Sequence, residues 1–105
     1  MPHDFRIEIN RDADRAVIHV AGEIDLSTRD LLGAAATRSF DVARTVVVDL
    51  AQATFLDSAG LSALIRARNE AERLGCELQI RSATDSVARV LEVTGLLHWL
   101  TASEA

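Results

Sequence analysis

The run Thr45-Val46-Val47-Val48-Asp49-Leu50 constrains the fold more than any other segment of the chain. It is rich in β-branched residues and shows no alternation of apolar and polar positions, a pattern typical of a strand buried on both faces. Strands of this kind occur in parallel sheets, where long crossover connections, usually helices, join successive strands. We therefore expect residues 45–50 to form a central strand of an α/β fold, with a helix before it and a helix after it.

Three further segments have the patterns of strands. Residues 5–9 and 76–80 alternate apolar with polar side chains, and residues 16–21 are more continuously apolar. The polar stretch 10–15 predicts a turn, so the chain is expected to open with a hairpin, and residues 22–28 predict a loop that leads into a helix. Residues 96–100 are a candidate for a short last strand. These segments predict a mixed β-sheet of four to five strands.

Three helices are expected between and after these strands. The first extends to Phe40 and has the spacing of a capping box between Ser27 and Asp30; the second covers about residues 58–74 and ends at Gly75; Thr84, Asp85 or Ser86 caps the third. Their apolar stripes are Leu31, Leu32, Ala35, Ala36 and Phe40 in the first, Leu61, Leu64, Ala67, Ala71 and Leu74 in the second, and Val87, Val90 and Leu91 in the third. Because the first and fourth strands keep one polar face, we expect the helices to pack mainly on one face of the sheet. Residues 1–105 are expected to form a single domain.

Charge and composition narrow the classes of partner. Sixteen acidic against eleven basic side chains give a formal net charge of −5, which argues against sequence-independent binding to nucleic acid or to anionic lipid and favours a partner with a basic surface. The sequence contains no apolar stretch long enough to span a bilayer and no pattern of a secretion signal at its start. With one cysteine, Cys76, an internal disulfide is impossible. These features predict a cytoplasmic protein.

The sequence indicates a functional site at the junction of the central strand with the second helix, where Asp57 and Ser58 are adjacent. One interpretation is that either residue simply caps the helix, which both residue types often do. Another is that Asp57 is the cap and that Ser58, at the first helical position, has a free hydroxyl open to phosphorylation, since a helix N-terminus favours negative charge. A third makes Ser58 a nucleophile, but the sequence around it lacks the first glycine of Gly-x-Ser-x-Gly.

Other chemically capable side chains are expected to be structural. Cys76 shares the inward phase of Leu78 and Ile80 and is predicted to be a core residue. His19 and His98 have neither a second metal ligand at a suitable spacing nor the setting of a catalytic triad. Trp99 is expected to pack against the last strand. No metal, cofactor or catalytic residue is therefore predicted.

Two segments resemble the motifs of the STAS domain family, which includes bacterial anti-sigma factor antagonists and the cytoplasmic tails of sulfate transporters. Gly22-Glu23-Ile24-Asp25-Leu26-Ser27-Thr28 resembles the Gly-Glu-(Leu/Ile)-Asp loop of that family, and Phe55-Leu56-Asp57-Ser58-Ala59-Gly60-Leu61 resembles its aromatic-apolar-Asp-Ser-(Ser/Ala)-Gly-Leu motif. Thr94-Gly95-Leu96 also resembles the family's Ser/Thr-Gly-Leu. The two main motifs occur together, at a separation that leaves room for a helix and a strand between them.

The resemblance implies an anti-sigma factor antagonist rather than an enzyme. In such a protein Ser58 is phosphorylated by a partner anti-sigma factor with ATP-dependent serine kinase activity, a Ser/Thr phosphatase removes the phosphate, and the unphosphorylated form binds the anti-sigma factor and frees the sigma factor. The partner-binding residues implied are Asp25, Ser27, Thr28, Asp57, Ser58, Ala59 and Gly60. The alternative is a STAS subunit of a membrane transport ATPase complex, without a phosphorylation switch.

Two departures from the family pattern bear on the site. Ala59 stands where many relatives have a second serine, which leaves Ser58 as the one hydroxyl directly beside Asp57. The chain is also expected to lack the terminal helix that many members carry after the last strand, which would reshape one edge of the partner surface.

Overall fold

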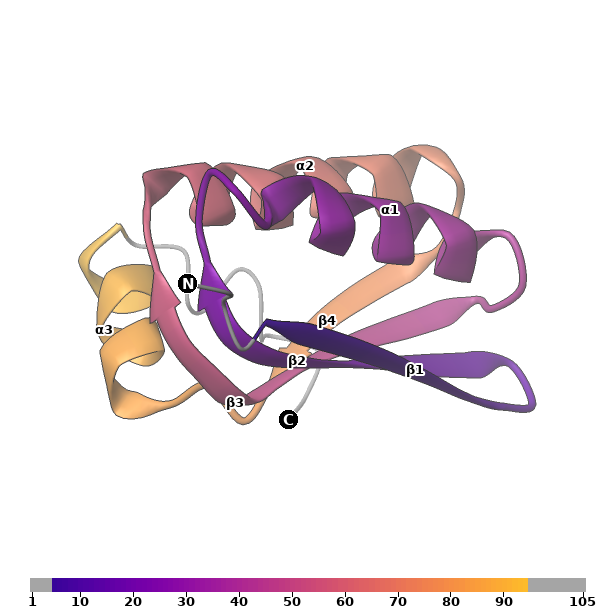
Figure 1. Ribbon diagram of the computed structural model, residues 1–105. Helices are drawn as coiled ribbons and strands as arrows, with labels where there is room; N and C mark the ends of the chain where they lie inside the picture. The colour runs from indigo at the N-terminus through magenta and orange to yellow at the C-terminus, as the bar shows by residue number, and fades with distance from the viewer. Residues whose placement is uncertain (1–4, 95–105) are drawn as a thin grey trace.

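A computed structural model describes residues 5–94, which form four strands and three helices (Figure 1). The elements are β1 (Arg6–Asp12), β2 (Arg15–Ile24), α1 (Arg29–Phe40), β3 (Thr45–Leu56), α2 (Ser58–Arg73), β4 (Glu77–Arg81) and α3 (Asp85–Val93). This is the β-β-α-β-α-β-α order predicted from the hydrophobic patterns. The candidate strand at residues 96–100 lies outside the described residues.

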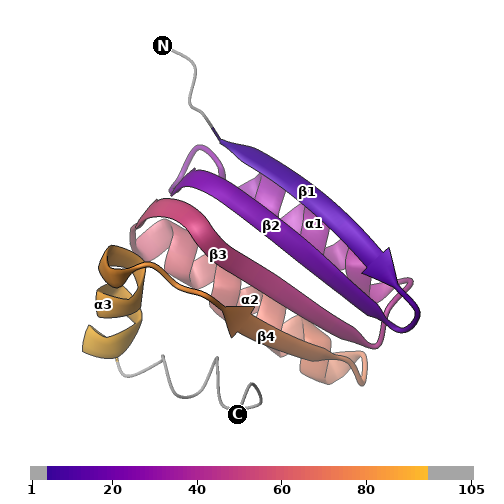
Figure 2. The ribbon, with the colours of Figure 1, turned by 90° about the horizontal axis from the view of Figure 1, so that it is seen from below.

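The four strands form one mixed sheet in the order β1-β2-β3-β4 (Figure 2). β1 and β2 are antiparallel, whereas β2 with β3 and β3 with β4 are parallel. The run of valines predicted to be central lies in β3, where Val46, Val47 and Val48 are buried between two neighbouring strands. The prediction of an α/β fold around a central strand is therefore confirmed.

The opening hairpin is tighter than predicted. The pairing of β1 with β2 continues to Asp12 and Arg15, so the turn consists of Ala13 and Asp14, and Ala13 has a φ of 54°. The polar residues 10–12, expected to belong to the turn, are exposed strand residues instead. A strand at the edge of a sheet tolerates polar side chains on both faces, because solvent reaches both of them.

Both central strands are also longer than predicted. β2 continues through the expected loop to Ile24, and β3 continues past Leu50 to Leu56, because the two ends pair with each other: Glu23 with Phe55 and Ile24 with Leu56. Irregularities between His19 and Ala21 and between Gly22 and Glu23 interrupt the ladder, and Gly22 has a φ of 100°, a conformation that suits glycine. Figure 1 shows that β2 and β3 curve upward together toward the start of α2.

Helices α1 and α2 cover one face of the sheet, as predicted, and α3 packs against β3 (Figures 1 and 2). Each buries one stripe, listed here: Leu32, Ala35, Ala36 and Phe40 from α1; Leu61, Leu64 and Ala71 from α2; Val87 and Leu91 from α3. Full burial of one such leucine contributes about 1.5–3 kcal/mol. The prediction was wrong for two leucines of these stripes: Leu31 is 57% exposed, and Leu74, the C-cap of α2, is 45% exposed. Both lie at the margin of a stripe, where helical periodicity does not separate buried from exposed positions.

Candidate functional site

The N-terminus of α2 is capped by Asp57. Its backbone is extended, with φ −105° and ψ −173°, and its Oδ1 accepts a hydrogen bond from the Gly60 N–H at 2.9 Å. The Asp57 carbonyl oxygen accepts from the Leu61 N–H at 2.8 Å, and the Asp57 N–H donates to the Ile24 carbonyl oxygen at 3.3 Å. A cap of this kind contributes about 1 kcal/mol. The prediction that Asp57, rather than Ser58, is the cap is confirmed.

Ser58 is the first residue of α2, and its side chain is exposed. Among residues 5–94 its hydroxyl has no hydrogen-bond partner. The first N–H groups of any helix lack intrahelical acceptors, and the helix macrodipole is positive there. The rest of the first turn, Ala59 to Leu61, is uncharged. A negative group added to the Ser58 hydroxyl would therefore meet a favourable local potential, offset in part by the neighbouring Asp57 carboxylate.

The loop between β2 and α1 is organised by Asp25. Its Oδ1 accepts hydrogen bonds from the Ser27 N–H at 2.9 Å and from the Ser27 hydroxyl at 2.7 Å. The bond from the Ser27 hydroxyl, followed by further bonds from the Ser27 and Thr28 groups, holds the pKa of Asp25 below its ordinary value, although partial desolvation acts in the opposite direction. Asp25 is therefore a fixed, ionised carboxylate at neutral pH.

The capping box predicted for α1 is wrong. Ser27 donates its hydroxyl to Asp25, and the N-cap position belongs to Thr28. The Thr28 hydroxyl donates to the Glu23 carbonyl oxygen at 2.7 Å and accepts from the Asp25 N–H at 2.9 Å, so it closes the loop rather than capping the helix. The Asp30 side chain is 95% exposed and lies 3.8 Å from the Arg29 guanidinium. The Ser27 hydroxyl binds Asp25 rather than the Asp30 region of the helix, because Asp25 lies within the same turn as Ser27.

Gly60 brings the two motifs together. A Cβ built on Gly60 would lie 2.4 Å from the Ile24 carbonyl oxygen and 2.8 Å from the Ile24 Cγ2. Only a glycine allows α2 to approach the end of β2 this closely. The Gly22–Thr28 segment and the Phe55–Leu61 segment, far apart in the chain, therefore form one continuous rim.

The residues predicted to bind a partner divide into two groups on this rim. Ser27 and Ser58 are exposed, and Asp25, Asp57 and Ala59 are half-buried, so their side chains reach the surface. Thr28 is 4% exposed and Gly60 is buried against Ile24. Thr28 and Gly60 therefore act by holding the loop and the helix in place.

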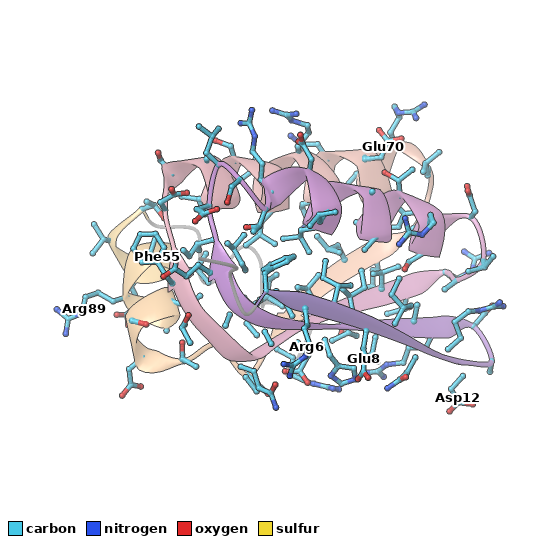
Figure 3. All side chains as sticks on the ribbon, viewed as in Figure 1. Arg6, Glu8, Asp12, Phe55, Glu70 and Arg89 are labelled. Atoms are coloured by element: carbon cyan, nitrogen blue, oxygen red, sulfur yellow. The ribbon has the colours of Figure 1, made fainter. Side chains whose placement is uncertain are left out.

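Two apolar side chains on the rim were not assigned a role from the sequence. Leu26 is 66% exposed and Phe55 is 46% exposed. Leu26 lies two residues after the end of β2, and Phe55 pairs with Glu23 across the ladder. Figure 3 places Phe55 at the end of the molecule where α2 begins. Exposed large apolar side chains at one edge indicate an interaction surface. The signal for Phe55 in the sequence is that it is the aromatic residue of the second motif.

The remaining candidates have structural surroundings. Cys76 is half-buried and packs against the core rather than within it, and its thiol lies 3.8 Å from the Phe40 carbonyl oxygen and 3.7 Å from that of Ala43. His19 Nδ1 lies 3.0 Å from Asp49 Oδ2. Within residues 5–94, no three His, Cys, Asp or Glu side chains are grouped to hold a metal ion, and no helix is long and apolar enough to cross a membrane. His98 and Trp99 lie outside the described residues.

Comparison with known proteins decides the family. A family model described as "Mlab, STAS domain" matches residues 7–102. The chain belongs to the STAS domain family. The match includes both motifs and every described element apart from the first residue of β1, so the resemblance seen in the two motifs and the predicted fold are confirmed.

Individual STAS relatives agree with this assignment. The anti-sigma-B factor antagonist of Listeria monocytogenes is 34% identical over 96 residues, which cover 89% of this chain and 83% of the relative. The unphosphorylated form of the anti-sigma factor antagonist SpoIIAA superposes with a TM-score of 0.75 at 21% identity, covering 90% of this chain and 84% of SpoIIAA. The phosphorylated form of the Bacillus cell fate determinant SpoIIAA has a TM-score of 0.69 at 20% identity, with 90% and 86% covered. The two SpoIIAA structures share the fold of this STAS domain.

Proposed function

We propose that this STAS domain is an anti-sigma factor antagonist that is switched by phosphorylation of Ser58. The unphosphorylated form binds an anti-sigma factor, and the anti-sigma factor then releases its sigma factor. Phosphate on Ser58 prevents the antagonist from binding the anti-sigma factor. The observation that carries the proposal is that two adjacent residues have different roles at the start of α2: Asp57 is the N-cap, and the Ser58 hydroxyl is exposed. The name of the Listeria relative supports the same role.

The physical basis of the switch is that phosphate affects the fold and the complex differently. A phosphoserine carries about −1.5 to −2 charges at neutral pH. In the free domain this charge stays in water at the positive end of α2, so the fold is expected to persist. In a complex that closes over Ser58, the same charge and its bulk must be buried, at a high cost unless the partner supplies matching cations.

The rim is the surface that we assign to the anti-sigma factor. It offers the partner polar side chains and the small side chain of Ala59; the polar ones are Asp25, Ser27, Asp57 and Ser58. The carboxylates of the rim suit a partner with basic groups, in agreement with the net charge of −5. The partner is the serine kinase, because the chain lacks a glycine-rich phosphate-binding loop of its own. A separate Ser/Thr phosphatase restores the unphosphorylated form. The domain itself carries out no catalysis.

Phosphate mapping tests the acceptor. The protein is incubated with the serine-kinase anti-sigma factor and ATP, and the modified peptide is sequenced by mass spectrometry. We expect one phosphate, on Ser58, and its loss in Ser58→Ala. Ser62→Ala is the matched control, because Ser62 is an exposed serine one turn further along α2 and should leave labelling unchanged. Undiminished labelling of Ser58→Ala would refute the assignment.

Co-purification tests the role. A pull-down from native lysate should recover a small protein kinase with the unmodified chain and lose it with Ser58→Asp. Recovery of a transport ATPase that is equally retained by Ser58→Asp would favour the alternative, a STAS subunit of a membrane transport complex. Circular dichroism of Ser58→Asp should show an intact fold, so that lost binding reports on the surface.

A further inference from the structure

The outer edge of β1 is a second candidate interface, far from Ser58. Within residues 5–94, only β2 pairs with β1, so the backbone groups on its other side are available to another strand. An apolar groove of about 410 Å³ runs between this edge strand and α1. Its lining is Phe5, Ile7, Ile9, Leu31, Ala34 and Arg38. An unpaired edge beside exposed apolar side chains is the usual setting for strand addition.

The charges along β1 identify which strand fits there. Arg6, Glu8, Asn10 and Asp12 share one face of the strand and point away from the helices, as Figure 3 shows for the three that it labels. Ile7 and Ile9 point to the opposite face and pack against the core. The strand begins with a cation and ends with an anion, so its charge pattern matches that of a second copy running in the opposite direction.

We propose that the chain forms a two-fold homodimer in which β1 pairs antiparallel with β1 of a second copy, with Ile9 on the symmetry axis. In this register Arg6 faces Asp12 of the second copy, Asp12 faces its Arg6, and Glu8 faces its Asn10. Each contact is made twice, as two-fold symmetry requires. The two sheets join into one of eight strands, and the two apolar grooves meet at Ile9.

Other symmetric registers fit less well. Directly opposite residues in antiparallel strands point to the same face, and side chains alternate between faces along each strand. If the helices of both copies lie on the same side of the joined sheet, the symmetry axis must therefore coincide with a residue position of β1 and cannot fall midway between two residues. An axis at Glu8 opposes two glutamates, and an axis at Asn10 opposes Glu8 with Asp12. An axis at Ile7 pairs Arg6 with Glu8 but leaves residues 9–12 without partners in the second copy's β1. The axis at Ile9 pairs all seven residues of β1 and opposes no like charges.

Sedimentation velocity over a concentration series tests the dimer. The unmodified chain should move from 11.4 kDa toward twice that mass as its concentration rises. Arg6→Asp opposes two aspartates at both ends of the interface, and Asp12→Arg opposes two arginines. Each should raise the dimer dissociation constant by about tenfold or more. An equimolar mixture of the two variants should recover dimers, because every pair in the mixed dimer is again of opposite charge.

Glu8→Lys is the matched control. It reverses a charge on the same face of the same strand but meets Asn10, so it should leave the dissociation constant unchanged. Loss of the dimer in Glu8→Lys with retention in Asp12→Arg would overturn the register at Ile9. A chain that stays monomeric at millimolar concentration, or a mixture that does not recover dimers, would overturn the proposal. Recovery in the mixture also shows that both variants fold. None of these results depends on the role of Ser58.

Discussion

Gly60 in α2 lies against the carbonyl oxygen of Ile24 at the end of β2, so closely that a Cβ on Gly60 would be 2.4 Å from it. This contact aligns the start of α2 with the Asp25 loop. It also leaves the Ile24 carbonyl oxygen within hydrogen-bond distance of the Asp57 N–H, at 3.3 Å. The geometry of the rim around Ser58 therefore depends on one glycine that does not itself reach the surface.

Gly60→Ala is expected to destabilise the domain by about 1–3 kcal/mol, because the added methyl group meets backbone and must push α2 away from β2. Urea denaturation measures the change. Gly33→Ala is the control, since a Cβ on Gly33 meets nothing within 4 Å, and alanine favours the helix by up to about 1 kcal/mol. Equal stability of the two variants would show that the close approach is not needed.

Replacement of Phe55 by serine is expected to weaken binding of the anti-sigma factor by about tenfold without lowering the stability of the domain. Large apolar side chains at the centre of an interface contribute most of its binding energy, and Phe55 is already half-exposed in the free domain. Isothermal titration calorimetry measures the affinity. Leu74→Ser is the control, because Leu74 is exposed to the same degree at the opposite end of α2. If both variants bind as the unmodified protein does, Phe55 is not part of the interface.

The face of the sheet opposite α1 and α2 carries a titratable group with a shifted pKa, that of Asp49. Burial alone would raise the pKa of Asp49, but the hydrogen bond from the Ala51 N–H, together with Arg81 and His19, brings it below its ordinary value. A carboxyl with a lowered pKa in the folded state stabilises the fold above its ordinary pKa of about 3.9, and this contribution is lost as the pH falls through the lowered value.

Arg81→Gln is therefore expected to raise the pKa of Asp49 and to move the acid loss of stability to higher pH. The pKa is measured by following the carboxyl carbon in an NMR titration, and the stability by denaturation at several pH values below 5. Arg66→Gln removes an exposed arginine of α2 and should change neither quantity. An Asp49 pKa that is the same with and without Arg81 would contradict the assigned cause.

The order of elements was predictable because each helix and strand has its own local period. The apolar run Thr45–Leu50 predicts a buried parallel strand, and Asp57 and Gly75 indicate the start and the end of α2. The extension of β2 to Ile24 and of β3 to Leu56 was not predictable, because it depends on pairing between segments about thirty residues apart. Gly22 and the exposed side chains near Phe55 resemble a loop when that pairing is unknown.

The candidate site was predictable in part for the same reason. The free hydroxyl of Ser58 follows from the local rule that one cap suffices. The failure of the Ser27–Asp30 capping box and the burial of Gly60 against Ile24 follow from contacts that exist only in the folded chain. The exposure of Phe55 also could not be predicted from local sequence, since an aromatic residue near the end of a strand is more often buried.

The central claim is that phosphate on Ser58 ends binding while the fold persists. The most direct test is the dissociation constant for the anti-sigma factor, measured by calorimetry on the same preparation before and after stoichiometric phosphorylation, with circular dichroism of both forms. The account predicts unchanged spectra and a dissociation constant raised about a hundredfold, or ~2.7 kcal/mol. Equal affinity of the two forms, or loss of the folded spectrum on phosphorylation, would contradict it.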